Sequence, residues 1–398
     1  MSKSPFITRV RLSNYKSIKS CDVRLRSLAV LVGPNGTGKS NFLDALRFTT
    51  DALTTTLDHA LRDRGGINEV RRRSGGHPTH FSVEFTLNLG EGRHGKYAYE
   101  IASAPSGGFR VKREECRLDG HLFRENHDLG FEVVDGEVDT NLDLKLPSPA
   151  PDRLFLVSAS NVDDIRPVYD ALTNMGFYNL SPAAIRQPQP PDPGTLLRRD
   201  GSNLASVLAN LERTRPEVLE RIVEYLRVLA PGIEGVRRID AGPMETIEFR
   251  QAVAGAQNPW RFGAINMSDG TLRGLGVLVA MLQAVGRPTT LIGIEEPEVA
   301  LHPAAVGVVI DAIRDASLHT QLIVTSHSPG LLDRDDLDPD ELLAVRSHEG
   351  VTEIGPLNEY GHTALRDKLF TPGELMRMNE LVPDPDSQIA EQSELFAE

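Results

Sequence analysis

The sequence predicts an α/β fold built around a mainly parallel sheet, and three patterns lead to this prediction. An apolar run at Leu28–Val32 passes into a glycine-rich turn and then into a segment with helical apolar spacing at Asn41–Phe48. Later in the chain, apolar runs at Thr290–Ile294 and Gln321–Thr325 alternate with helical segments. This alternation is typical of parallel strands that are joined by helices.

The region between these α/β parts has a different pattern. Phe81–Leu87 alternates apolar and polar residues, and Tyr97–Ile101 and Gly108–Leu118 continue an extended pattern, which together predict an antiparallel side sheet. Asn203–Leu211 and Pro216–Leu229 show helical apolar spacing. We therefore expect an inserted helical subdomain after the side sheet.

These patterns predict one large unit over residues 1–378. It would contain a lobe with the glycine-rich loop at 1–150, an inserted helical and linker region at 151–235, and a second lobe at 236–378. Residues 379–398 contain acidic but no basic residues, which predicts a disordered acidic tail.

Composition narrows the class of protein. The chain has 398 residues, 40% of them hydrophobic, which is enough for a substantial core. Its net charge of -13 argues against a surface that binds nucleic acid indiscriminately. No apolar stretch has the length of a membrane span and no signal peptide is evident, so we expect a cytoplasmic protein without membrane contact. Cys21 and Cys116 lack the spacing of a zinc site or disulfide framework.

The glycine-rich turn matches the phosphate-binding pattern GxxxxGK[ST]. Successive backbone N–H groups of such a loop wrap phosphates, and glycines permit the turns that this requires. Lys39 would reach the β- and γ-phosphates of ATP, and Ser40 would ligate Mg²⁺. The residues predicted to bind nucleotide here are Gly33, Asn35, Gly36, Thr37, Gly38, Lys39, Ser40 and Asn41.

A second candidate site follows the apolar strand Leu291–Ile294, which ends in Glu295 and Glu296. Adjacent strand residues point to opposite sides, so the two acids can have different tasks. Glu295 would face Mg²⁺, and Glu296 would act as general base for the attacking water. The alternative is a surface loop that happens to begin with two acids.

Two further motifs have polar groups at the ends of predicted elements. His327 follows the strand Gln321–Thr325 and is a candidate sensor of the γ-phosphate, although a lone histidine is more often structural. Ser268 and Gly270 directly precede a predicted helix over Leu272–Leu282 and offer a hydroxyl and free N–H groups to an anion. A plain helix N-cap is the alternative.

Taken in this order, the motifs resemble those of the RecF/SMC/OLD-like group of ABC-type P-loop ATPases, and Val10–Leu31 is similar to the first strands of that group. The resemblance implies an ABC-ATPase head that binds ATP and Mg²⁺ and forms a homodimer or higher homo-oligomer through its ATP sites. It also implies that Ser268 and Gly270 contact ATP on a neighbouring subunit. Asp269 departs from the common LSGGQ form, and Glu295 stands where Asp is usual.

Two functions are compatible with this resemblance. In OLD-like and Septu-type antiphage systems, such an ATPase regulates a separate effector such as a nuclease. The alternative is a RecF-like ATP-gated DNA-binding clamp in DNA repair. About 70 residues follow His327, fewer than an ordinary Toprim domain needs, so we expect that domain to be lacking.

The best candidate DNA contacts are basic residues that follow the phosphate loop. They are Arg62, Arg64 and Arg71–Arg73, with Arg198–Arg199 and Arg237–Arg238 as weaker candidates. A basic run is more often a solvated face than a binding site, so this alternative stays open.

Overall fold

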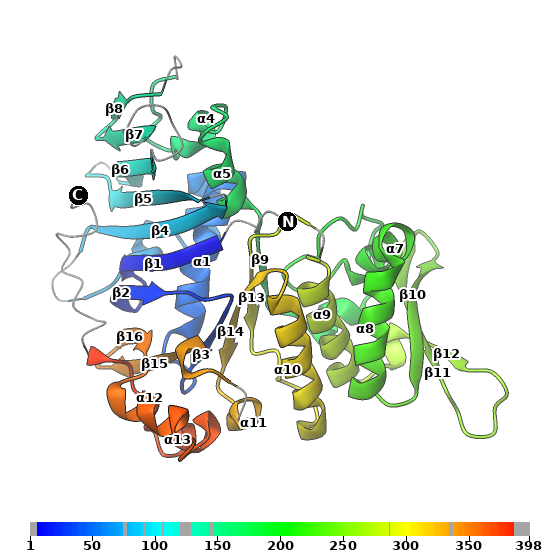
Figure 1. Ribbon diagram of the computed structural model, residues 1–398. Helices are drawn as coiled ribbons and strands as arrows, with labels where there is room; N and C mark the ends of the chain where they lie inside the picture. Colours follow the sequence, from blue (N-terminus) through cyan, green and yellow to red (C-terminus); the bar gives the residue numbers. More distant parts are fainter. Residues whose placement is uncertain are drawn as a thin grey trace. The chain divides into compact units, whose positions relative to one another are not determined.

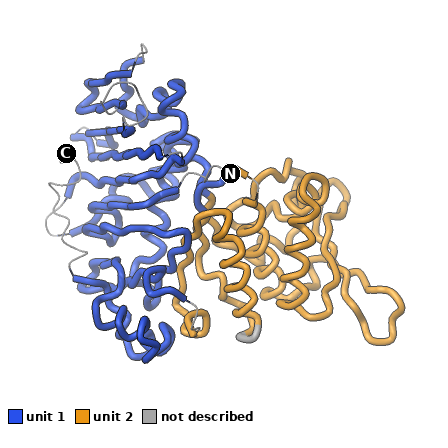
Figure 2. The backbone as a smooth tube through the Cα atoms, in the orientation of Figure 1, with its two compact units in different colours: residues 1–175, 289–291, 335–398 blue, residues 176–288, 292–334 orange. Residues whose placement is uncertain are grey.

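The computed structural model describes residues 6–74, 78–90, 92–105, 107–119, 129–142, 147–285, 287–333 and 337–385. The chain divides into two compact units, which are coloured separately in Figure 2. Unit 1 consists of residues 1–175, 289–291 and 335–398, and unit 2 of residues 176–288 and 292–334. The three-part division expected from the sequence remains a prediction.

Unit 1 carries most of the large mixed sheet (Figure 1). Its strands are β1 Phe6–Tyr15, β2 Ile18–Arg24, β3 Leu28–Val32, β4 His80–Gly90, β5 Arg93–Ser103, β6 Phe109–Leu118, β7 Leu129–Val134, β8 Glu137–Thr140, β15 Leu342–His348 and β16 Val351–Pro356. They lie in the order β8-β7-β6-β5-β4-β1-β2-β16-β15-β3. Neighbours from β8 to β2 pair antiparallel, whereas β16 joins β2 and β15 joins β3 in parallel. The predicted side strands therefore belong to the same sheet as β1.

The helices of unit 1 are α1 Lys39–Thr54, α2 Leu57–Arg62, α3 Ile67–Val70, α4 Leu156–Ala159, α5 Arg166–Thr173, α12 Glu359–Arg366 and α13 Pro372–Arg377. Helix α1 packs its apolar face on the sheet through a group of aromatic rings. The rings of Phe48 and Tyr15 each form an edge-to-face pair with the ring of Phe81, with centroids 5.4 and 5.5 Å apart. Such edge-to-face pairs stabilise beyond the area they bury. This packing holds the start of α1, and with it Lys39, against the sheet.

Unit 2 combines three strands of the large sheet with helices and a small separate sheet. The strands β14 Gln321–Ser326, β13 Leu291–Glu295 and β9 Met175–Tyr178 are neighbours in that order. The helices are α6 Pro182–Arg186, α7 Leu204–Thr214, α8 Pro216–Leu229, α9 Asp269–Leu282, α10 Pro303–Ser317 and α11 Pro329–Leu332. The small antiparallel sheet contains β10 Ile233–Ala241, β11 Met244–Gln251 and β12 Trp260–Gly263. The predicted α/β class is thus confirmed, whereas the sequence did not predict this small sheet.

The predicted acidic tail is described only up to residue 385. Within that part, the backbone N–H of Asn358 donates to the Val382 carbonyl at 3.0 Å, and the N–H of Asp384 donates to the Pro356 carbonyl at 2.8 Å. The beginning of the segment is therefore attached to the end of β16. Residues 386–398 lie outside the described residues.

Both cysteines are buried free thiols, and burial raises the pKa of each far above its usual value. This agrees with two inert thiols in the core. Over the described residues, no helix combines the length and the apolar character needed to cross a membrane.

Glu114 on β6 is a buried acid of unit 1 that predicts a pH-dependent stability. Its carboxylate accepts from the Leu156 N–H at 2.8 Å and the Tyr97 hydroxyl at 3.0 Å, but burial outweighs these bonds and raises its pKa from 4.5 to about 7. Between these two pH values the unfolded chain has lost this proton and the folded chain keeps it, so the free energy of unfolding falls as pH rises.

We therefore expect the unfolding free energy of the wild type to fall between about pH 5 and pH 8, relative to that of Glu114→Gln, by on the order of 3 kcal/mol. The variant has no titrating group at this position, so it lacks this contribution. Urea unfolding of both proteins across this range measures the difference. Parallel pH profiles for the two proteins would contradict the assignment.

Candidate functional site

The loop between β3 and α1 has the backbone shape that its glycines predict. Gly36 and Gly38 adopt φ values of 77° and 102°, in the left-handed region that other residues rarely enter. A Cβ atom at Gly33 would lie 2.1 Å from the Val345 carbonyl oxygen of β15, so this position has no room for a side chain. The glycine spacing therefore serves both the turn and its close contact with a neighbouring strand.

Lys39 lies inside this loop. Its Nζ donates to the carbonyl oxygens of Gly33 at 2.7 Å and Pro34 at 2.8 Å, and the residue is only 5% exposed. The Thr37 hydroxyl also donates to Pro34, at 2.9 Å. A fixed cation beside the positive end of α1 is suited to an anion. Ser40, one residue into α1, is exposed and its hydroxyl is available to a ligand.

Asp44 in α1 lies at the centre of a cluster of cations. Its carboxylate accepts from Lys16 Nζ at 2.6 Å and from the Arg64 guanidinium at 3.0 Å. Burial of Asp44 opposes ionisation, but Arg64 and Lys16 together hold its pKa well below the usual range. The Arg64 side chain is 2% exposed and its guanidinium lies 5.2 Å from the centre of the Phe48 ring. Arg64 is therefore part of the core, which corrects its assignment as a DNA contact.

Most of the other candidate DNA contacts also have partners. Arg62 pairs with Asp58, Arg71 with the Pro78 carbonyl, Arg73 with Glu69, Arg198 with Asp192, Arg237 with Glu248 and Arg238 with Glu245. Exposed pairs of this kind are weak and can exchange partners. They indicate a surface of mixed charge rather than a basic patch.

In unit 2, β13 ends at Glu295 and the chain turns sharply at Glu296. Glu296 has φ 47°, which is unusual for a residue with a side chain, and its N–H donates to the Thr325 carbonyl at 3.0 Å. The two acids have different partners, but not because adjacent strand residues alternate. Strand β13 ends at Glu295, and the left-handed turn at Glu296 separates the two side chains. Such backbone outliers persist where the surrounding structure holds them, often at functional sites.

The Glu296 carboxylate contacts His327, with 2.9 Å between Oε1 and Nδ1. An ionised carboxylate can only accept, so Nδ1 of His327 carries the hydrogen of this bond. Both side chains are about one third exposed, at 33% and 32%. The pair can therefore be reached from solvent, as a base for a water molecule must be.

Glu295 is held by an ion pair that the sequence did not predict. Arg199 donates to Glu295 Oε1 at 2.9 Å, and the Glu295 side chain is 18% exposed. The sequence marked Arg199 only as a weak DNA candidate, because nothing local connects it to a residue so distant along the chain. A cation already compensates the charge at the position where Mg²⁺ is expected.

Arg273 of α9 binds the backbone of the turn at Glu295 and Glu296. Its guanidinium donates to the Glu296 carbonyl at 3.0 Å and the Glu295 carbonyl at 3.2 Å. Burial lowers the pKa of Arg273. Glu298, also buried, accepts from the Ser326 hydroxyl at 2.6 Å, and burial raises its pKa. The acid-rich turn is thus tied to α9 and to the end of β14.

Ser268 caps helix α9, as the alternative reading of that motif proposed. Its Oγ accepts from the Thr271 N–H at 3.2 Å, and the residue is exposed. Gly270 fits tightly, since a Cβ there would lie 2.6 Å from the Ala300 carbonyl oxygen. Arg186, which the sequence did not single out, pairs with Asp269 and also donates to the Met267 carbonyl at 3.0 Å. These contacts hold the loop in place, and the exposed Ser268 brings its hydroxyl to the surface.

Each unit, taken by itself, contains donors of the kind that a nucleotide and its magnesium ion require. Oxygen ligands such as the Ser40 hydroxyl and the Glu295 carboxylate are those that Mg²⁺ prefers. The phosphate loop and Ser40 belong to unit 1, whereas Glu295, Glu296, His327, Ser268 and Gly270 belong to unit 2.

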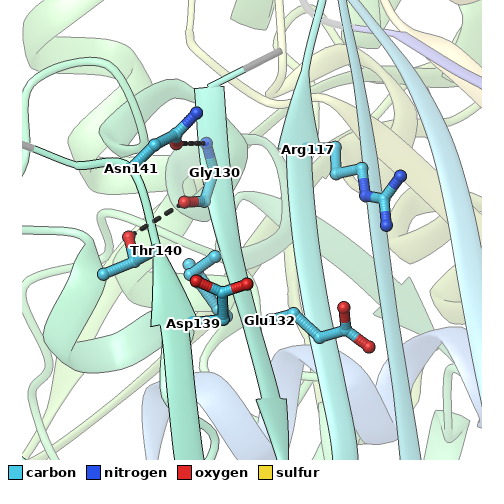
Figure 3. A pocket seen from close by; sticks show the side chains of 7 residues that line it. Arg117, Gly130, Glu132, Asp139, Thr140 and Asn141 are labelled. Atoms are coloured by element: carbon cyan, nitrogen blue, oxygen red, sulfur yellow. Dashed lines mark hydrogen bonds between the residues drawn. The ribbon is translucent and has the colours of Figure 1, made fainter. Parts of the chain in front are cut away.

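A separate pocket of about 280 Å³ lies on β6, β7 and β8 of unit 1 (Figure 3). Arg117, Glu132 and Asp139 line it with charges of both signs. Its other polar groups bond one another, since Thr140 Oγ1 donates to the Gly130 carbonyl at 2.9 Å and the Gly130 N–H donates to Asn141 at 2.8 Å. This pocket therefore has no set of free groups that indicates a ligand.

Comparison with solved structures gives the same fold. The chain is similar to an SmcHead bound to the C-winged helix domain of ScpA, with 17% identity, a TM-score of 0.57 and coverage of 90% of this chain and 99% of that one. A second match is an Smc head domain with an extended coiled coil from Pyrococcus furiosus, bound to the C-terminal domain of ScpA. It has 14% identity, a TM-score of 0.54 and coverage of 92% and 99%. No curated protein sequence matches the chain.

A family profile matches residues 28–333, with the description "AAA domain, putative AbiEii toxin, Type IV TA system". This span includes the phosphate loop, the Ser268 loop, the two glutamates and His327. Since it covers most of the 398 residues, the chain belongs to this AAA-domain family and has the fold of an SMC-type ABC ATPase head.

Proposed function

We propose that this protein is a Mg²⁺-dependent ATPase whose ATP-bound form is a dimer with two nucleotides at the interface. The observation that carries this proposal is the phosphate loop, in which Gly36 and Gly38 take left-handed turns and Lys39 is held among the loop carbonyls. Family membership and the head-like fold support an ATPase.

In this proposal the loop residues from Gly33 to Asn41 bind the phosphates through backbone N–H groups and the Lys39 charge. Ser40 and Glu295 would hold Mg²⁺, which neutralises phosphate charge. Arg199 donates to Oε1 of Glu295, and the second oxygen of the same carboxylate could ligate the ion. Glu296 would accept the proton of the attacking water, and His327 would keep its carboxylate in position.

Dimerisation explains why the chain has two places suited to phosphate. The phosphate loop already supplies one anion site, so an exposed serine at the start of α9 would serve the nucleotide of a neighbouring subunit. Asp269 introduces a negative charge there, and its pairing with Arg186 compensates that charge. This makes the loop more compatible with phosphate than its sequence alone indicates.

We further propose that the ATPase regulates a separate effector protein, a nuclease in an OLD-like or Septu-type antiphage system. The family description mentions a toxin–antitoxin system, and two similar head domains bind a separate protein, ScpA. The alternative, a RecF-like DNA clamp, is weakened by the burial of Arg64, which was one of its candidate contacts. Stimulation of ATP hydrolysis by DNA alone, without any effector, would favour the clamp instead.

Mixed dimers test the shared site. Lys39→Ala and Ser268→Arg subunits are each expected to be inactive alone, the first because it lacks the phosphate-binding cation and the second because a bulky cation blocks the facing surface. A dimer of one with the other restores one complete site, with activity up to about half that of the wild-type dimer if the sites act independently. ATP hydrolysis by mixed and unmixed preparations measures this.

The control is the ATP affinity of the Ser268→Arg monomer, which should remain near that of the wild type because its own phosphate loop is intact. No recovery in dimers shown to be mixed would contradict independent shared sites. Hydrolysis by a strictly monomeric wild type would exclude the dimer model altogether.

A further inference from the structure

A chain of hydrogen bonds connects the phosphate loop and the first turn of α1 with two residues outside them. Asn41 Nδ2 is 2.7 Å from Ser17 Oγ, Ser17 Oγ is 2.7 Å from Thr352 Oγ1, and Thr352 Oγ1 is 2.8 Å from the Thr37 carbonyl oxygen. All four residues belong to unit 1. Ser17 lies in the turn between β1 and β2, and Thr352 lies in β16, beyond the span of the family match.

The partners determine the direction of every bond in this chain. The Thr37 carbonyl can only accept, so the single hydroxyl hydrogen of Thr352 must point to it. Thr352 Oγ1 therefore accepts from the hydroxyl of Ser17, and Ser17 in turn accepts from the amide group of Asn41. Every donor therefore points the same way along the chain of bonds, from Asn41 towards Thr37. Hydrogen bonds arranged in this way strengthen one another.

The last bond orients a backbone donor of the loop. A trans peptide unit is planar, so the carbonyl of Thr37 and the N–H of Gly38 point in opposite directions. Because Thr352 holds the Thr37 carbonyl, the Gly38 N–H is turned away from β16. The Gly38 N–H is one of the backbone groups expected to wrap the phosphates.

Close packing at Gly38 strengthens this effect. A Cβ atom at Gly38 would lie 2.1 Å from Thr352 Oγ1 and 2.8 Å from its Cγ2, so Thr352 leaves no room for a side chain at this position. Thr352 is 1% exposed, and its N–H donates to the Ser17 carbonyl at 2.9 Å. These contacts restrict the Thr352 side chain. Thr352 in turn leaves the peptide unit between Thr37 and Gly38 little freedom to rotate.

We propose that Thr352, assisted by Ser17, is a positioning residue for nucleotide binding, which sets the direction of the Gly38 N–H toward phosphate. This inference rests on the proposed ATP site. It assigns a role in that site to a strand near the far end of the sequence.

The test is equilibrium binding of ATP to Thr352→Val, which keeps the shape and the methyl group but removes the hydroxyl. We expect about tenfold weaker ATP binding, because the Thr37 carbonyl loses its buried donor and the peptide can rotate. Thr352→Ser retains the hydroxyl and should restore affinity to within about twofold of the wild type. A role that depended only on the shape or the methyl group of Thr352 would not produce this difference between valine and serine.

Thr49→Val is the matched control for stability. Thr49 is also a fully buried threonine of unit 1, and its Oγ1 bonds the Tyr99 hydroxyl at 2.8 Å, away from the loop. It should lower the melting temperature of the protein without changing ATP affinity. If Thr352→Val does not fold, Ser17→Ala replaces it, with an expected loss of about threefold, since the Thr352 bond to Thr37 remains.

The outcomes separate the two proposals. Unchanged ATP affinity in folded Thr352→Val, or in Ser17→Ala if that variant decides the test, overturns the positioning role and leaves the ATP site intact. Equal losses of affinity in Thr49→Val and Thr352→Val would also overturn it. Failure of the wild type to bind ATP would instead refute the proposed function.

Discussion

Replacing Glu296 with glutamine is expected to abolish ATP turnover while ATP binding persists. Glutamine can still accept a hydrogen bond from His327, but it cannot take a proton from water, so kcat should fall by about 10²–10⁴-fold. The backbone at position 296 is held by Thr325 and Arg273 through main-chain groups, which the substitution leaves in place. Steady-state hydrolysis and equilibrium ATP binding on the same preparation measure the two effects.

The same variant should accumulate as a closed dimer when ATP is added, because the step that would open it is lost. Size-exclusion chromatography with and without ATP provides the check. Hydrolysis at the wild-type rate would show that another group is the base.

Replacing Lys39 with alanine is expected to remove ATP affinity itself, by about 10²-fold or more, since the lysine charge opposes the phosphate charge already before reaction. The effect should be large because Nζ is buried against the carbonyls of Gly33 and Pro34. No other cation is expected to take its place there. Equilibrium binding of ATP gives the result directly.

Lys112→Ala serves as its control, because Lys112 is another lysine of unit 1, paired with Glu100 on the neighbouring strand. Its loss should leave ATP affinity unchanged. An unaltered affinity in Lys39→Ala would refute the interpretation of the phosphate loop.

The elements with strong local patterns could be predicted from the sequence. The strands β1 to β6, the helices α1 and α7 to α10, and the strands β13 and β14 all follow apolar runs or regular spacing. The hairpin of β15 and β16 was not predicted from the sequence. Its turn contains Glu349 and Gly350, which both adopt positive φ, at 49° and 76°. Such turns join antiparallel strands, but the pair Glu349 and Gly350 lacks the Asn or Asp that usually precedes glycine in a turn of this kind.

The sequence by itself determined the groups that lie close together along the chain: the phosphate loop, the serine at the start of α9, and the acids at the end of β13. Their chemistry depends on consecutive residues, so a short pattern contains it. Tertiary structure alone decided the partners of these groups. Thr352 reaches Thr37 because β16 adjoins β2, Arg199 reaches Glu295, and Arg64 is buried on Asp44 instead of facing a ligand. Hydrogen bonds and ion pairs form between whichever groups the fold brings within about 3 Å, and separation along the chain contains no information about that distance.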